Sequence, residues 1–260
     1  MRFALIAAAV VFAACSPAAN TNAAPAGSAG TTQIATSPVS ASAPSIVAAI
    51  ADTHRPDADR ARDAARHPAE TLAFAEVQPG QKIGELLPGE GYFTRLFSSV
   101  VGANGHVYPV SRSATDQYEH TVLVGTPNVT NVIQPYDAYH FPEQLDLVFT
   151  AQNYHDMKIL QYHMGSTIDM NRMAFAALKP GGHYVIIDHV AATGSQENQE
   201  HPLHRIDPAV VRREVESVGF VYDGEMQILR NPADPHTASV FDPSIRGHTD
   251  QFAMRFRKPS

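Results

Sequence analysis

From residue 79 onward, short apolar runs alternate with segments whose apolar residues recur at helical spacing. The apolar runs have the length of strands, and turn residues such as Pro79 and Gly80 bound them. We expect strands at 82–87, 106–110, 128–134, 145–150, 184–188, 220–222, 226–229 and 252–256. We expect helices at 92–101, at 164–178 and from Pro208 onward. This alternation predicts a doubly wound, mostly parallel α/β sheet, which binds ligands at the carboxyl ends of its strands.

The segment before this domain predicts helices without strands. Ile46 and Ile50 share one face of a short helix, and Pro68 opens another. Residues 45–78 are therefore expected to form a helical cap ahead of a main domain at 79–260.

The first 15 residues have the pattern of an export signal. Arg2 precedes an unbroken apolar run at 3–12, which is shorter than the about 20 residues that a membrane-spanning helix needs. Small residues then stand directly before Cys15, and the segment resembles a bacterial lipoprotein signal. That resemblance implies a lipid on Cys15, and Ser16 in place of Asp implies the periplasmic face of the outer membrane. The alternative is a plain secretory signal with an incidental cysteine; in both cases the mature chain leaves the cytoplasm.

Residues 16–44 form a spacer of low complexity. They are almost entirely Ala, Ser, Thr, Pro, Asn and Gly. Such a stretch cannot bury enough apolar surface to offset its ordering entropy. We expect a flexible tether that gives an anchored domain slack.

Charge and cysteine content exclude several classes of protein. The chain has 26 acidic and 19 basic residues and a formal net charge of −7, so a nucleic-acid partner is not expected. Cys15 is the only cysteine, which rules out an intramolecular disulfide and a zinc site built from cysteines. Membrane contact is expected only through a lipid on Cys15.

Two glycines follow the first expected strand. Gly89 and Gly91 allow a ligand close to the backbone, and the helix expected at 92–101 presents free N–H groups in its first turn. The placement between a first strand and a first helix favours a ligand-binding loop. The alternative is a structural turn that needs a positive φ at Gly89 or Gly91.

This loop resembles the first motif of the class I S-adenosylmethionine-dependent methyltransferases. That motif reads acid-x-Gly-x-Gly-x-Gly; Glu85, Gly89 and Gly91 occupy three of its four positions, and Leu87 replaces the first glycine. The resemblance implies a seven-stranded Rossmann-like sheet, S-adenosylmethionine as cofactor and a small-molecule substrate. Cofactor-binding roles are implied for Glu85, Gly89, Gly91, Tyr92, Ser111, Asp137 and Ala138.

The resemblance extends along residues 79–257. Asp137 and Ala138 follow the third expected strand, where the family has the acid that meets adenine, and residues 178–182 match the turn before the fifth strand. More narrowly, the chain is similar to a group of bacterial predicted methyltransferases that share the motifs at 153–156, 203–207 and 249–250.

The end of the second strand departs from the family pattern. Class I methyltransferases usually place an acid here that binds both ribose hydroxyls, whereas this chain has Ser111. A hydroxyl offers only uncharged hydrogen bonds, so the loss costs about 1.5–3 kcal/mol for each charge-assisted bond. This departure weakens the cofactor prediction and leaves the fold prediction intact.

His155 is the candidate catalytic base, with Asp156 as its partner. The pair follows the fourth expected strand, and the resemblance to small-molecule O-methyltransferases implies that it removes a proton from an acceptor hydroxyl. An imidazole with the ordinary pKa of about 6.5 suits that step. The alternative is that His155 caps a helix or makes a local hydrogen bond.

A second polar cluster follows the fifth expected strand. It consists of His189, His201, His204, Arg205 and Asp207. Substrate-binding roles are expected for Tyr154, His204, Arg205 and Asp207. A structural salt-bridge network is the alternative for the last three.

Neither a metal site nor a serine hydrolase is expected from these residues. His201 and His204 have a two-histidine spacing, but Pro202 lies between them and a third ligand is missing. No Gly-x-Ser-x-Gly elbow follows a strand. We therefore assign no metal ligands.

Two functions remain open. The first is methyl transfer from S-adenosylmethionine to a small hydroxylated acceptor, with His155 as base. The second is an exported ligand- or metal-binding protein that keeps the fold without methyl transfer. The export signal favours the second function, since S-adenosylmethionine is made in the cytosol. Ser111 favours it too, because the acid that binds the ribose is missing. A measurement of cofactor binding distinguishes the two functions.

Overall fold

The computed structural model describes residues 39–115, 120–197 and 199–260. These residues belong to one unit of the chain, 37–260. The expected signal at 1–15 with its Cys15, and residues 16–38 of the expected linker, lie outside the described residues.

Seven strands form one sheet in the described part of the chain. They are β1 (Lys82–Leu86), β2 (His106–Ser111), β3 (Val132–Ile133), β4 (Leu145–Ala151), β5 (Leu178–His189), β6 (Val221–Met226) and β7 (Gln251–Arg257). Their order is β3-β2-β1-β4-β5-β7-β6. All neighbouring strands are parallel except β7, which runs antiparallel to both β5 and β6. The predicted doubly wound, mostly parallel α/β sheet is confirmed.

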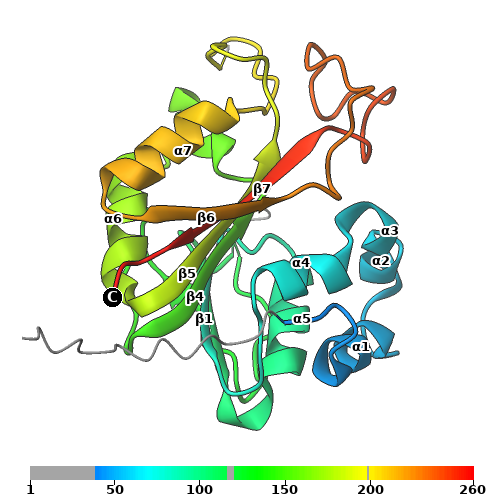
Figure 1. Cartoon of the computed structure of the whole chain (residues 1–260), viewed down its shortest axis with the longest axis vertical. Helices are drawn as coiled ribbons and strands as arrows, with labels where there is room; N and C mark the ends of the chain where they lie inside the picture. Colours follow the sequence, from blue (N-terminus) through cyan, green and yellow to red (C-terminus); the bar gives the residue numbers. More distant parts are fainter. Residues whose placement is uncertain (1–38, 116–119, 198) are drawn as a thin grey trace, which may run out of the picture. The chain divides into compact units, whose positions relative to one another are not determined.

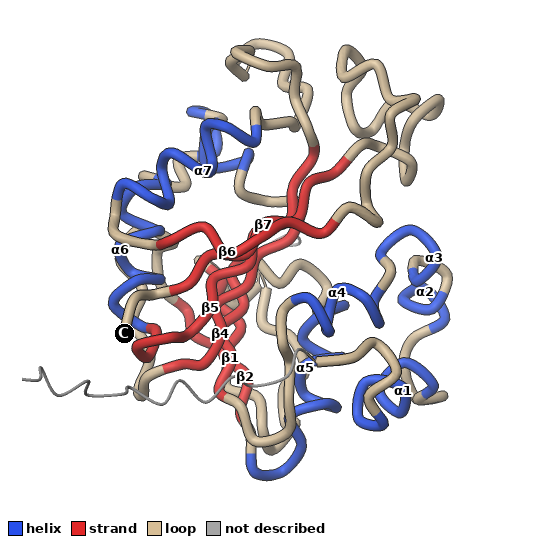
Figure 2. The backbone as a smooth tube through the Cα atoms, viewed as in Figure 1, coloured by secondary structure: helices blue, strands red, loops and turns tan. Residues whose placement is uncertain are grey.

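Helices cover both faces of this sheet. The helices are α1 (Pro44–Ala51), α2 (Asp57–Arg60), α3 (Asp63–Arg66), α4 (Pro68–Phe74), α5 (Tyr92–Val101), α6 (Thr167–Ala177) and α7 (Pro208–Ser217). Figures 1 and 2 show α6 and α7 on one side of the sheet, and α1, α4 and α5 on the other. Each face has its own buried core, one containing Val211 and Tyr184, the other containing Leu96 and Phe149.

The sequence of α5 explains how it is placed behind β1. Phe93, Leu96, Phe97 and Val100 recur at helical spacing and are all buried, so one face of the helix packs on the sheet. Phe93 and Phe97 both contact the ring of Phe149 from β4, with centroids 4.8 and 5.0 Å away. This packing aims the first turn of α5 at the carboxyl ends of the strands.

Several expected boundaries differ from the structure. The third strand is only Val132–Ile133, because residue Val129 makes a single bridge to Val107 instead of a ladder. The strand expected at 226–229 is wrong: β6 ends at Met226. β5 begins at Leu178, since Leu178 pairs with Leu145 and a register shift absorbs the Pro-Gly-Gly turn before pairing resumes at 183.

The helices at 44–74 lie against α5. Asp59 of α2 accepts a hydrogen bond from Arg95 Nε at 2.6 Å, and Asp63 of α3 accepts one from the Tyr92 hydroxyl at 2.7 Å. Arg66 of α3 donates to Gln152 Oε1, just past β4, at 2.8 Å. The cap is therefore tied to the edge of the sheet where ligands are expected. Among the described residues, no helix is long and apolar enough to cross a membrane.

Candidate functional site

The carboxyl ends of β1 and β4 meet where the strand order changes direction. β1 continues to β2 and β3 on one side, and β4 continues to β5 on the other. Open α/β sheets bind ligands in the crevice at such a point. Asn153 joins the loops that follow the two strands, because its Nδ2 donates to the carbonyl of Leu87 at 3.0 Å. The glycine loop and the His155 segment are thus neighbours, as predicted.

The loop after β1 has a left-handed backbone at three positions. Leu87, Gly89 and Gly91 have φ values of 53°, 55° and 80°. Leu87 therefore keeps a glycine-type conformation, although a side chain in this region costs about 1–2 kcal/mol. A Cβ added at Gly89 would meet no atom within 4 Å. The loop thus leaves room for a nucleotide-like ligand against its backbone.

Glu85, at the end of β1, is held inside the protein. It is 3% exposed, and its carboxyl group accepts a hydrogen bond from the hydroxyl of Thr94 in the first turn of α5. Burial raises the pKa of Glu85 to about 8, against the opposing effects of the Thr94 hydrogen bond and of Arg66 and Arg95. At neutral pH the group is mostly uncharged. It therefore braces the loop against α5 from the inside.

Tyr92 is the point where the cap meets the glycine loop. Its side chain is 2% exposed, and Arg66 stacks on the ring with its guanidinium carbon 4.6 Å from the centroid. Burial lowers the pKa of Arg66 to about 10, with a further contribution from the charge of Arg62. The side chain of Tyr92 thus binds the helical cap to α5. Its backbone N–H is one of the free donors in the first turn of α5.

The positions expected to hold the ribose and the adenine lie in different surroundings. Ser111 is fully buried, and its hydroxyl donates to the carbonyl of His120 at 3.0 Å. This hydroxyl therefore already has a hydrogen-bond partner within the chain. Asp137 is half-buried, with one oxygen 3.4 Å from the backbone nitrogen of Ser166, and Ala138 is exposed. The adenine side is therefore more accessible than the ribose side.

His155 lies in a short 3-10 turn (His155–Lys158, η2) directly after β4. Its Nδ1 contacts Asp188 Oδ1 at 2.6 Å, and its backbone N–H donates to Asp188 Oδ2 at 2.8 Å. Asp188 is the second-last residue of β5 and is fully buried. The ring nitrogen on the other side, Nε2, lies 3.1 Å from Asp156 Oδ1. The imidazole is thus fixed between two carboxylates.

The surroundings of His155 shift its pKa away from the expected value. Burial disfavours the imidazolium, but the charge of Asp188 and hydrogen bonds to Asp156 and Asp188 outweigh burial and raise the pKa of His155 to about 10. Burial acts against the charge of Asp156, yet hydrogen bonds from His155 and His204 lower the pKa of Asp156 to about 2. His155 therefore does not keep the ordinary pKa that a base at neutral pH needs.

His204 completes this cluster from the loop after β5. Its Nδ1 lies 3.3 Å from His155 Nε2 and 3.1 Å from Asp156 Oδ1. Its backbone has a φ of 57°, a left-handed conformation that histidine adopts more readily than most residues. The expected meeting of His155 and His204 at one edge of the sheet is found, while His201 is exposed and lies outside the cluster.

The fold holds the other expected substrate-binding groups. Tyr154 is fully buried, and its hydroxyl donates to Glu214 Oε2 at 2.8 Å. Arg205 is paired with Asp234, 2.8 Å away, and the two side chains are 1% and 0% exposed. Asp207 accepts hydrogen bonds from the backbone of α7 and from Gly194. The polar atoms of Tyr154, Arg205 and Asp207 thus already have partners inside the fold, as the alternative of a structural network has it for the last two, and their substrate-binding roles stay predictions.

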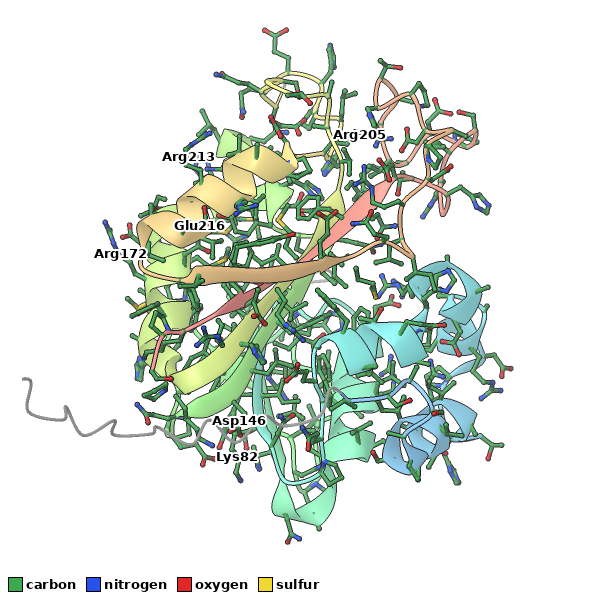
Figure 3. All side chains as sticks on the ribbon, in the orientation of Figure 1. Lys82, Asp146, Arg172, Arg205, Arg213 and Glu216 are labelled. Carbon is green, nitrogen blue, oxygen red and sulfur yellow. The ribbon has the colours of Figure 1, made fainter. Side chains whose placement is uncertain are left out.

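Figure 3 shows the two ends of the sheet by their charged residues. Lys82 and Asp146 lie at one end, where β1 and β4 begin, and Arg205 lies at the opposite end among the loops after β5. In Figure 1 the loop at 190–207 and the loop at 227–250 both rise from that end. The cluster around His155 is therefore on the side of the sheet where the strands end and these loops begin.

A cavity of about 310 Å³ adjoins this end of the molecule. Its lining comes from η2, the loop after β5 and the start of α7, and includes Lys158, Glu197, Arg205, Asp207 and Arg213. Eight of its ten lining residues are charged or polar, and they present both polar atoms and aliphatic carbon to the cavity. They suit a polar small molecule better than an apolar one.

Two residues of this region have roles that sequence reasoning misses. The sequence pattern presents Asp188 only as the last residue of an apolar strand, yet it is the carboxylate that orients His155. Arg66 ends a charged, Ala-rich stretch without an expected role, yet it bridges the cap to Gln152. An acid that ends a buried strand, next to His189, is the signal available for Asp188.

Known proteins match this chain in fold, whereas comparisons of sequence find no match. No protein-family model and no curated protein matches the chain. A solved 1,6-didemethyltoxoflavin-N1-methyltransferase from Burkholderia thailandensis, with bound 1,6-didemethyltoxoflavin and S-adenosylhomocysteine, is 14% identical with a TM-score of 0.52 and covers 79% of this chain and 80% of its own. A putative sarcosine dimethylglycine methyltransferase from Galdieria sulphuraria is 14% identical with a TM-score of 0.52, over 77% and 86% of the two chains.

The chain has the class I methyltransferase fold. The cyclase SpnF is a further match, 15% identical with a TM-score of 0.52 over 78% of this chain and 81% of its own. Proteins described as methyltransferases and as a cyclase thus share this architecture. The reaction has to be argued from the site.

Proposed function

We propose that the protein is an S-adenosylmethionine-dependent methyltransferase that acts on a polar small-molecule acceptor. The loop at 87–91 carries this proposal. It has three left-handed residues at the carboxyl end of β1, open space beside Gly89, and the first turn of α5 directly behind it. Glycine-type loops before a helix N-terminus accept nucleotide-like ligands because backbone N–H groups face the ligand.

The chain's own residues divide the work in this proposal. The backbone at Gly89 and the start of α5 hold the cofactor, and Asp137 lies on the adenine side. When bound, the cofactor supplies an activated methyl group on sulfonium. The protein aligns the acceptor with that methyl group and keeps water out. The cavity bordered by Lys158 and Arg213 supports a polar acceptor.

O-methylation with His155 as base is the finer part of the proposal. With a pKa of about 10, only about one imidazole in a thousand is neutral at pH 7. A base of this kind makes turnover rise about tenfold per pH unit between pH 7 and 9. The assay is release of S-adenosylhomocysteine with a panel of hydroxylated acceptors across that range. A flat profile removes His155 as the base, and His155→Gln tests the same point at one pH.

Cofactor binding tests the proposal directly. We expect calorimetric titration of S-adenosylmethionine and S-adenosylhomocysteine into the full chain to show micromolar binding. Gly89→Ala should weaken it, because a methyl group then occupies the space beside the loop. Gly80→Ala is the control, since Gly80 also has a positive φ and open space but lies before β1, at the other end of that strand. No binding up to millimolar concentration, in chain shown to be folded, refutes methyl transfer.

We also propose that the chain is an exported lipoprotein on the periplasmic face of the outer membrane. The apolar run at 3–12, the small residues before Cys15 and the spacer at 16–44 support this proposal. Cell fractionation of the wild type and of Cys15→Ala tests it. Membrane association that survives Cys15→Ala contradicts the lipid anchor.

A further inference from the structure

Three metal-ligand atoms converge at the ends of β4 and β5. They are His155 Nε2, His204 Nδ1 and Asp156 Oδ1, and their separations are 3.3, 3.1 and 3.1 Å. We propose that His155, Asp156 and His204 bind one divalent transition-metal ion. The site does not depend on methyl transfer, because the ion binds whether or not the cofactor does. It replaces the role of His155 as a base, since an ion on Nε2 uses the lone pair that would accept a proton.

The size of this triangle fits a metal ion. If an ion lies about 2.1 Å from each of three atoms that are about 3.2 Å apart, the ligand–ion–ligand angles are about 100°. This value lies between the octahedral and the tetrahedral angle. Such an ion lies about 1 Å above the plane of the three atoms.

Asp188 gives the site its outer support. It contacts His155 Nδ1 at 2.6 Å and also accepts hydrogen bonds from the backbone of His155 and His189 at 2.8 and 2.7 Å. This arrangement puts a proton on Nδ1 and directs the lone pair of Nε2 into the triangle. A carboxylate behind a metal-bound histidine is the usual second layer of such sites.

The charges of the site call for a cation. Asp156 and Asp188 bring two negative charges to a region where His155 is 3% exposed and Asp188 is fully buried. The guanidinium of Arg205, next to His204 in the chain, is already paired with Asp234. With both histidines neutral, a divalent ion balances the two carboxylates. The competing arrangement is a protonated His155 shared between Asp156 and Asp188.

The backbone and the exposure of the cluster are consistent with access to an ion. His204 has a strained φ of 57°, and strain of this kind clusters at functional sites. Its side chain is 11% exposed and that of Asp156 is 20% exposed. The triangle is therefore reachable from outside, unlike Asp188 behind it.

The donor set selects the kind of ion. Two imidazoles and one carboxylate suit Zn²⁺, Fe²⁺, Co²⁺ or Mn²⁺, whereas Mg²⁺ and Ca²⁺ prefer oxygen alone. In the folded chain such an ion would supply a Lewis acid.

Metal titration of the full chain, purified without a histidine tag and stripped by chelation, tests the site. We expect one equivalent of Zn²⁺ by calorimetry and one of Co²⁺ by visible absorption. Asp188→Asn should lower affinity about 10–100-fold, and Asp156→Asn or His204→Asn should lower it further. Asparagine suits the left-handed position of residue 204. His201→Asn, in the same loop and outside the cluster, is the matched control and should bind as the wild type does.

A second measurement uses only the wild type, in case a variant does not fold. The Co²⁺ form should show two exchangeable, hyperfine-shifted imidazole N–H signals, one from His155 Nδ1 and one from His204 Nε2. Folded chain that takes up neither ion, uptake that Asp156→Asn and His204→Asn leave unchanged, or a Co²⁺ form without these signals would overturn the proposal. Any of these results leaves the proton-bridged arrangement as the structure of the cluster.

Discussion

Replacing Glu85 by glutamine should change how stability depends on pH. Burial raises the pKa of Glu85 from its ordinary 4.5 to about 8. Between these two values the folded chain keeps the proton of Glu85, whereas the unfolded chain has released it. The contribution of Glu85 to the free energy of unfolding is therefore highest below pH 4.5 and falls as pH rises toward 8. Glutamine has the same shape and no proton to lose.

The size of this effect follows from the shift. Each pKa unit corresponds to about 1.4 kcal/mol, so the wild type should lose about 3 kcal/mol between pH 5.5 and pH 7.5 relative to Glu85→Gln. Other titrating groups are common to both proteins and cancel in the difference. The amide oxygen introduced by Glu85→Gln can still accept the hydrogen bond from Thr94, which limits other effects of the substitution.

Urea unfolding of both proteins at several pH values measures the difference. Glu90→Gln is the matched control, since Glu90 lies in the same loop and is exposed. A difference between Glu85→Gln and wild type that stays constant from pH 5.5 to 7.5 would refute the reasoning. It would mean that Arg66 and Arg95 keep the carboxyl ionised in the folded chain.

Two further substitutions test groups that we assign to the fold. Asp234→Asn should lower the free energy of unfolding by about 3–5 kcal/mol, because it leaves Arg205 buried without its counter-charge. A loss under about 1 kcal/mol in urea unfolding would mean that water reaches this pair. Asp207→Ala should lower the free energy of unfolding by about 1–2 kcal/mol, since the carboxylate accepts hydrogen bonds from the backbone of Ala209 at the start of α7 and of Gly194. Unchanged unfolding would show that other groups cap this helix.

Local patterns were enough to predict most of the fold. The helix at 92–101 and the strands around β1, β2 and β4 follow from apolar spacing and from glycines at the boundaries, which are properties of neighbouring residues. The exceptions lie where pairing with a distant strand decides. The register between Leu178 and Leu145 extends β5 through a Pro-Gly-Gly turn that reads as a loop.

The site was predictable in position and less so in chemistry. The loops that follow parallel strands share one edge of the sheet, so the predicted strands place His155, His204 and the glycine loop there. The partner of His155 is Asp188, 33 residues away, and only the pairing of β4 with β5 brings the two together. The same holds for Arg205 with Asp234. The raised pKa of His155 is a sum over these contacts, so composition and spacing could not supply it.

The position of β7 has a consequence for how the chain is made. This strand, at 251–257, lies between β5 and β6 and pairs with both. Until residues 251–257 have been made, β5 has an open edge and β6 has no partner, so the sheet stays incomplete. A chain cut short before residue 251 would leave the backbone groups along one edge of β5 unpaired. Such an edge can pair with another chain and promote aggregation. The sheet is therefore completed only after β5, β6 and β7 have all been made, and Thr249 then contacts His189.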